Sequence, residues 1–399
     1  MSDDRPLPAA VLPAMPDRRE RAPQRMDALV VAAPALFLLI GVALRYAAYV
    51  SINPIASPQG FADAMCVWDC YWYGEVAQHG YQAYPEVLNF GGPGGIANWA
   101  FFPLYPMLLR LAGRLLPFLN PAALGAIVSP LLTFAAVFAA WPLFEGNRRG
   151  YFLFGALLLA GPFSFYFATA YSESLFLLLT VLAFASLRRD NYGGAGIAGA
   201  LLSATRTVGV LFVLSVLTQI ALTLWFPAKR PLPLLKTLLG RPDMIFALVA
   251  VPLGVLAFTL WLHFVTGDSL AFVHIQRGWD RELVNPFQAL WDGFTATGDR
   301  LQDQKWLALA AVIGLALCGA LFATKRYAEA IFCALSLLLA LGNGVESMVR
   351  FVAALAPLNL VAAELLARKR SLFWLVLLAS MALDYVLTQQ WLHQHGALM

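Results

Sequence analysis

Residues 28–50 read ALVVAAPALFLLIGVALRYAAYV and contain a single charged side chain, Arg45. About 20 consecutive apolar residues suffice to cross a bilayer as an α-helix. Trp306–Thr324 is a second run of this kind. Over the whole chain 60% of the residues are hydrophobic and 13% are charged, whereas soluble domains are about half apolar and a quarter charged. The sequence therefore predicts an integral, multi-pass membrane protein.

The apolar runs recur along the chain, and a helix satisfies its own backbone groups inside lipid. The predicted fold is an all-α, polytopic membrane helical bundle with about eleven transmembrane helices. The predicted spans are approximately residues 28–50, 121–143, 151–168, 173–187, 195–205, 208–226, 244–264, 306–324, 327–343, 349–367 and 371–390. Residues 27–399 would form one membrane domain.

Lys and Arg recur in every second connection between these spans, and such clusters mark the cytoplasmic side. The clusters are Arg18–Arg25, Arg148–Arg149, Arg188–Arg189, Lys229–Arg241, Lys325–Arg326 and Arg368–Arg370. Residues 1–26 then form a disordered basic cytoplasmic tail, because they hold too little apolar surface to pack. Two long extracytoplasmic loops, about 51–120 and 265–305, are predicted to carry short amphipathic helices.

Several function classes are unlikely on composition and motifs alone. The net charge of +4 is small and its basic residues lie between apolar runs, which argues against a nucleic-acid partner. The chain lacks a Walker sequence, a Gly-rich phosphate loop and a Ser/His/Asp pattern. We therefore expect no cofactor and an activated substrate that arrives through the membrane lipid.

The first long loop contains CVWDCYWYGEVAQHGY over residues 66–81. Asp69 is the candidate catalytic base, because a carboxylate among aromatic side chains at a membrane boundary is open to an amphiphilic substrate. It could equally cap the following helix. Glu75 is a second polar contact or part of a solvated face.

Cys66 and Cys70 flank Asp69. A disulfide is chemically permitted outside the cytoplasm, but spacing of four residues on one helix would strain it. Together with His79 they suggest a metal site only weakly, because no other part of a zinc spacing pattern is present. We predict no metal.

Other polar residues of the extracytoplasmic side are candidate substrate contacts. Tyr105 follows NWAFFPL, which leads into an interfacial helix that either anchors the loop or touches substrate. Glu173 and Arg206 adjoin apolar spans, where charged groups are costly and tend to be functional. Arg206 either forms a structural ion pair with Glu173 or binds a substrate phosphate. The same two interpretations apply to Arg350. Gln276, Arg277 and Trp279 in the second loop could bind a sugar or phosphate, or form a solvated face.

Taken in order, these segments resemble the GT-C superfamily, and in particular the family of the GPI-anchor second mannosyltransferase and its bacterial relatives. The resemblance rests on Trp68-Asp69 with Gly80-Tyr81, on FFPLYP at 101–106, on SESLF at 172–176 and on TRTVG at 205–209. The segments 267–279 and 347–357 also look like family features, so the likeness covers most of residues 40–360.

The resemblance implies an inverting glycosyltransferase, with mannose as the expected sugar. It implies a polyprenyl-phosphate-linked sugar donor and a glycan, lipid or protein acceptor. Asp69 would take the proton of the acceptor hydroxyl, and Arg206 or Arg350 would stabilise the departing phosphate. Glu75, His79, Tyr105, Glu173, Gln276, Arg277 and Trp279 complete the expected substrate site. The expected location is a bacterial inner membrane, with the site facing the periplasm.

Two other classes stay open. A transporter or lipid-linked glycan flippase would also be polytopic with a few intramembrane charges, although transporters usually contain internal repeats and none is evident here. A noncatalytic assembly subunit would use the aromatic first loop as a docking surface.

Overall fold

The computed structural model describes residues 27–86, 95–225, 238–279, 281, 283–297, 301–394 and 398. The predicted tail 1–26 lies outside these residues. In the described ranges the chain is almost entirely helical, and its only β-pairing is one isolated bridge between Glu86 and Ile96. The predicted all-α class is confirmed.

In the described part of the chain, six helical segments are long and apolar enough to cross a membrane. They are α1 (Ala28–Ile52), α5 with η3 (Pro121–Phe144), η5 with α9 and part of η6 (Thr207–Leu224), α12 (Pro242–Thr266), the Gln304–Ala323 part of α15 (Leu301–Ala323) and α19 (Arg370–Leu392). A seventh crossing is added if α17 (Met348–Ala354) and α18 (Ala356–Leu366), bent by 79° at their junction, form one span.

The remaining predicted spans coincide with shorter helices, namely α6 (Arg148–Ala160), α7 (Glu173–Leu187), α8 (Tyr192–Ser203) and α16 (Tyr327–Leu341). Every predicted range therefore overlaps a helix, although 151–168 runs past the end of α6 at Ala160 and 349–367 contains the break between α17 and α18. Length and composition support six or seven crossings among the described residues, so the predicted number of eleven is not confirmed.

Local sequence explains where these helices begin and end. Asn120, Asn147 and Asn191 each accept a hydrogen bond from a first-turn amide and so cap α5, α6 and α8. Helix α12 ends at Gly267, whose φ of +77° favours glycine. Inside the bundle, a Cβ atom at Gly254 would lie 2.1 Å from the carbonyl oxygen of Ala200. Glycine at that position therefore permits the close packing of α12 on α8.

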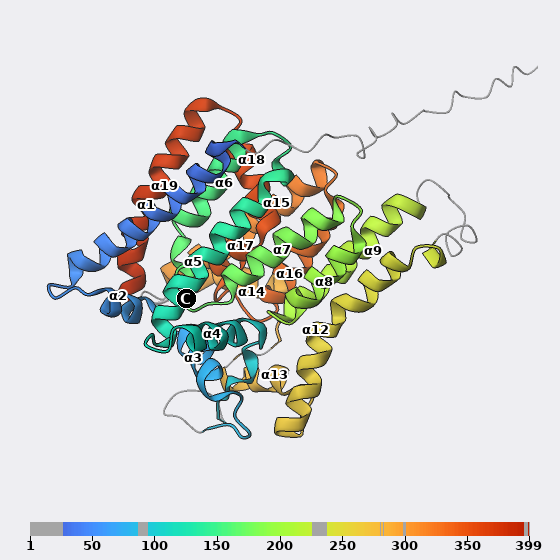
Figure 1. Cartoon of the computed structure of the whole chain (residues 1–399), viewed down its shortest axis with the longest axis horizontal. Helices are drawn as coiled ribbons and strands as arrows, with labels where there is room; N and C mark the ends of the chain where they lie inside the picture. Colours follow the sequence, from blue (N-terminus) through green and yellow to red (C-terminus); the bar gives the residue numbers. More distant parts are fainter. Residues whose placement is uncertain are drawn as a thin grey trace, which may run out of the picture.

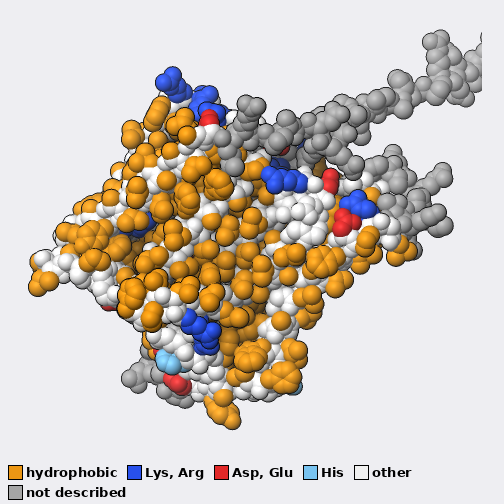
Figure 2. Space-filling view, viewed as in Figure 1, with side chains coloured by type: hydrophobic (Ala, Val, Ile, Leu, Met, Phe, Trp, Pro, Cys, Tyr) orange, Lys and Arg blue, Asp and Glu red, His pale blue; other side chains and the backbone are white. Residues whose placement is uncertain are grey.

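The short helices of the two long loops gather at one end of the bundle. They are α2 (Pro58–Met65), α3 (Asp69–His79), η2 (Asn98–Ala100), α4 (Leu104–Leu115), α13 (Ala271–His274), η7 (Ile275–Trp279) and α14 (Pro286–Thr295). Of these, α3, α4 and α13 lie in the lower part of Figure 1, near the lower end of α12. Hydrophobic side chains cover the middle of the same face, and Lys and Arg gather toward its upper edge (Figure 2).

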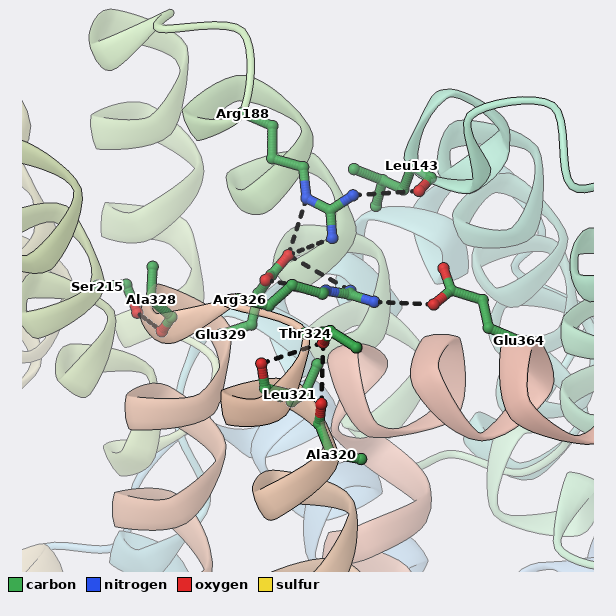
Figure 3. Close-up of polar contacts among 10 residues, drawn as sticks. All are labelled: Leu143, Arg188, Ser215, Ala320, Leu321, Thr324, Arg326, Ala328, Glu329 and Glu364. Atoms are coloured by element: carbon green, nitrogen blue, oxygen red, sulfur yellow. Dashed lines mark hydrogen bonds and ion pairs between the residues drawn. The ribbon is translucent and has the colours of Figure 1, made fainter. Parts of the chain in front are cut away.

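At the opposite end, an ion-pair cluster joins α7, α16 and α18 (Figure 3). Arg188 Nε lies 2.9 Å from Glu329 Oε1, and Arg326 Nε lies 3.0 Å from Glu329 Oε2. Arg326 Nη1 also lies 3.3 Å from Glu364 Oε2. At the same end Arg148 pairs with Asp27. Members of the predicted cytoplasmic clusters thus lie together, away from the loop helices.

Candidate active site

Asp69 begins α3 directly after a sharp turn. Trp68 has φ 48° and ψ −112°, which is a costly conformation for a residue with a side chain. The turn is held in place by the Tyr171 hydroxyl, which donates to the carbonyl of Val67 at 3.1 Å, and by Thr169, which donates to the carbonyl of Met65 at 3.1 Å. The carboxylate of Asp69 accepts from Arg350, and α3 has no side-chain cap. The alternative that Asp69 caps the helix is therefore wrong.

A disulfide between Cys66 and Cys70 also fixes this turn, with the two Cα atoms 5.2 Å apart. The expectation that helical spacing would strain such a bond is wrong. Helix α2 ends at Met65 and α3 begins at Asp69, so the two cysteines do not share a helix. In the described part of the chain, no group of three or more His, Cys, Asp or Glu side chains is arranged to hold a metal ion.

Buried charges continue from Asp69 into the bundle. Arg350 lies in α17 and is 6% exposed, and its Nε lies 3.5 Å from Glu173 Oε1. Glu173 is the first residue of α7 and also pairs with Arg206 at the start of η5. The Arg350 guanidinium stands over the Tyr171 ring at 5.3 Å, and that of Arg206 stands over the Phe351 ring at 4.9 Å. One buried carboxylate thus orients two guanidinium groups.

These groups border a cavity of about 710 Å³ between the loop helices and the ends of the bundle helices. Its polar lining consists of Asp69, Tyr73, Thr205, Arg206, Thr207, His274, Gln276, Arg277, Arg281, Asn343 and Arg350. Its apolar lining includes Phe101, Phe102, Phe272, Trp279, Leu283, Leu339 and Phe351. A cavity with one strongly polar and one apolar part suits an amphiphilic ligand.

The cavity is rich in positive charge. Four guanidinium groups line it, whereas Asp69 is the one carboxylate among the described lining residues, with Glu173 behind it and Glu346 near Arg281. Burial alone would raise the pKa of Asp69, but Arg350, Arg281 and Arg206 outweigh that effect and hold its pKa below the usual value of 3.8. Burial lowers the pKa of Arg281, and Asp69 partly offsets this. The site therefore favours an anionic ligand, and Asp69 stays ionised at neutral pH.

Six of the ten predicted site residues line this cavity: Asp69, Arg206, Gln276, Arg277, Trp279 and Arg350. Glu173 lies directly behind them. Tyr105 is fully buried, and its hydroxyl shares a hydrogen bond of 2.7 Å with Ser129 rather than facing the cavity. Glu75 and His79 lie outside the cavity lining and pair with each other at 3.1 Å.

Six polar residues of the cavity were not among the predicted ones: Tyr73, Thr205, Thr207, His274, Arg281 and Asn343. Tyr73 lies one helical turn after Asp69, and its hydroxyl donates to Ser172 at 2.7 Å. Its spacing from Asp69 on the same helix could have indicated it. Arg281 follows Trp279-Asp280 in a charged stretch that resembles an ordinary solvated loop. Only the fold brings it to the cavity.

No family model matches the chain. In solved structures, the chain resembles ArnT from Cupriavidus metallidurans bound to undecaprenyl phosphate, with a TM-score of 0.52 and 13% identity over 89% of this chain and 63% of that one. It also resembles the oligosaccharyltransferase AglB from Archaeoglobus fulgidus in complex with an inhibitory peptide and a dolichol-phosphate. There the TM-score is 0.50, with 13% identity over 91% of this chain and 56% of AglB.

By its likeness to these structures, the chain has the GT-C fold that its motifs predicted. Among curated sequences, the chain is 28% identical over 180 residues to GPI alpha-1,6-mannosyltransferase 2 of Cricetulus griseus. That match covers 42% of this chain and 34% of the hamster protein. The chain thus spans less than two thirds of the length of each of these relatives.

Proposed function

We propose that this protein is an inverting membrane glycosyltransferase that moves a hexose from a polyprenyl-phosphate-sugar donor to an extracytoplasmic acceptor. The observation that carries the proposal is the cavity itself, in which one carboxylate, Asp69, faces four arginines. A phosphate-bearing lipid supplies further negative charge to a cavity with an excess of arginines, and it supplies an apolar chain that suits the aromatic wall. The relatives are consistent with this ligand, since one is bound to undecaprenyl phosphate and another to a dolichol-phosphate.

In the proposed reaction, Asp69 removes the proton of an acceptor hydroxyl while that oxygen attacks the anomeric carbon of the sugar. The bond from this carbon to the phosphate oxygen breaks on the opposite face, so the anomeric configuration inverts. The polyprenyl phosphate leaves as an anion and needs no acid. Arg206, Arg277, Arg281 and Arg350 are close enough to the cavity to stabilise the negative charge that develops on it.

The ion pair between Arg350 and Asp69 has a consequence for this reaction. A carboxylate whose lone pairs are taken by a guanidinium group is a poor base. A donor phosphate competes with Asp69 for Arg350, because a phosphate accepts bidentate hydrogen bonds from arginine. We therefore expect donor binding to free Asp69, so that the donor binds before the acceptor.

The finer assignments belong to the same proposal. Mannose is the proposed sugar, on the likeness to GPI alpha-1,6-mannosyltransferase 2. The acceptor is a glycan, lipid or protein hydroxyl, and Gln276 and Trp279 are proposed to contact the sugar. The proposed location is a bacterial inner membrane with the cavity on the periplasmic side, opposite the basic clusters.

The test is a panel of donors offered to the purified protein in one detergent. Polyprenyl-phosphate mannose, glucose and arabinose, each carrying a radiolabelled sugar, are incubated with membrane extract as the acceptor source. We expect transfer from the mannose donor, with a product anomer opposite to that of the donor. Transfer from another of these donors would contradict only the assignment of mannose as the sugar. Absence of transfer from all of them would contradict the transferase and favour the transporter or flippase.

A further inference from the structure

The turn that carries Asp69 is supported by a helix from the far end of the sequence. Trp391, near the end of α19, is fully buried. Its indole N–H donates to the carbonyl of Met65 at 3.1 Å, and its ring meets the Trp68 ring edge-on with centroids 4.7 Å apart. Trp391 therefore touches the residue directly before Asp69 and the end of the helix that precedes the turn.

Trp391 also packs against Tyr171, which contacts Arg350, the other partner of the Asp69 ion pair. Its ring lies 5.8 Å from that of Tyr171. Tyr171 in turn donates to the carbonyl of Val67 and lies under the guanidinium of Arg350. One side chain thus packs against the supports of both Asp69 and Arg350.

The C-terminal half of α19 is itself held by buried polar contacts. Asp384, fully buried, accepts from the Ser164 hydroxyl at 2.7 Å and from Arg45 of α1 at 3.4 Å. Beyond the end of α19 at Leu392, the Tyr166 hydroxyl donates to the carbonyl of Leu398 at 2.8 Å. These contacts hold α19 against α1 and against the turn that precedes Tyr171.

We propose that Trp391 is a positioning residue for the transfer reaction, which sets the place of Asp69 relative to Arg350 through the 65–68 turn. This inference rests on the proposed function. If the Trp391 ring were not packed beside it, the strained Trp68 backbone would relax and Asp69 would shift. A displacement of about 1 Å at a reacting group lowers the rate about a hundredfold. Trp391 does not touch the cavity, so substrate affinity depends on it little.

The test compares Trp391→Leu and Trp391→Phe with the wild type, using Trp374→Leu as the matched control. Trp374 lies on the same helix and is half exposed. We expect Trp391→Leu to lower kcat at least about tenfold with the donor KM within about threefold. Trp391→Phe keeps an aromatic ring and loses the N–H, so its loss should be smaller. Trp374→Leu should behave as the wild type.

Two further readouts separate positioning from general folding. If Asp69 drifts from Arg350, its pKa rises, so the acid limb of kcat/KM moves to higher pH in Trp391→Leu. A variant that merely folds less well loses active molecules and keeps the wild-type pH profile. Hydrogen exchange should increase in the peptide covering residues 65–71 and stay unchanged in the peptides of α7 and α8.

An unchanged kcat in Trp391→Leu, or a loss of activity with an unshifted pH limb and unchanged exchange at 65–71, would overturn the inference. The exchange measurement does not need activity. If the wild type transfers no sugar, the proposed function fails, and protection of residues 65–71 by Trp391 is still decided by exchange alone.

Discussion

Asp69 should work as a base over an unusually wide pH range. Its pKa is raised by burial and lowered more strongly by Arg350, Arg281 and Arg206, so it lies below 3.8. A carboxyl of this kind stays ionised as the pH falls. Its contribution to stability is fully present above its pKa in the unfolded chain, and it is lost as the pH falls through its pKa in the folded protein. We predict that kcat/KM, measured against pH, has no acid limb down to about pH 4.

Replacement of Arg350 by methionine tests the cause of that behaviour. With the nearest cation gone, burial raises the pKa of Asp69 and the acid limb moves upward, while kcat falls because a phosphate contact is also lost. A profile with the same limb as the wild type would mean that Arg350 does not control the ionisation of Asp69.

Glu173 is the carboxylate that holds two guanidinium groups in the bundle, so its charge should matter for folding. Glu173→Gln keeps the shape and leaves Arg206 and Arg350 buried with one partner fewer. Breaking a buried pair typically costs about 3–5 kcal/mol. We predict a clearly lower apparent Tm in detergent, followed by tryptophan fluorescence. Glu75→Gln is the control, because Glu75 pairs only with the exposed His79 and should change the Tm little. Equal Tm values for both variants would contradict this account.

At the scale of elements, the turn between α2 and α3 depends on its disulfide. Cross-linking so short a loop stabilises it by about 2 kcal/mol through chain entropy. We predict that the double variant Cys66→Ala/Cys70→Ala folds, binds the donor, and transfers sugar several-fold more slowly. Cys318→Ala is the control, because Cys318 is a free cysteine buried in α15. Full wild-type kcat in the double variant would show that the other contacts of the turn are sufficient.

The elements themselves were largely predictable, because the length and apolarity of a run determine whether it forms a helix in lipid. The missed feature is a break: α17 and α18 were predicted as one span, 349–367. Ser347 adopts φ +65° before α17, and α18 begins beside Pro357 after a 79° bend. Pro357 was visible in the sequence and disfavours a continuous helix. The positive φ of Ser347 was not visible.

For the whole molecule, the predicted orientation can be measured. The described basic residues Arg148, Arg188 and Arg326 lie at the end of the bundle opposite the cavity, so one cysteine placed at each end should react from opposite sides. In sealed vesicles of known orientation, we predict that a membrane-impermeant maleimide labels His79→Cys from the outside and Arg189→Cys only after the membrane is opened. Labelling of both from one side would contradict the topology.

The assembly of the site could be predicted only in part. Asp69, Arg206 and Arg350 were identified because each charge stood out against apolar neighbours. Their mutual geometry was not accessible, since Asp69 and Arg350 are 281 positions apart and meet through tertiary packing. The same holds for Trp391, which reads in the sequence as one more apolar residue of the last span. The segment that contains Tyr105 does reach the cavity, through Phe101 and Phe102. The Tyr105 hydroxyl itself lies inside the bundle, where it shares a hydrogen bond with Ser129.

Asp69 and the arginine-lined cavity are proposed to perform sugar transfer. The most direct measurement compares transfer of radiolabelled mannose from polyprenyl-phosphate mannose by the wild type and by Asp69→Asn, in one detergent and with equal donor binding verified. We predict that Asp69→Asn loses a factor of about 10²–10⁴ in kcat, the usual contribution of a general base, while remaining folded. Transfer by Asp69→Asn at a rate close to that of the wild type would contradict the account.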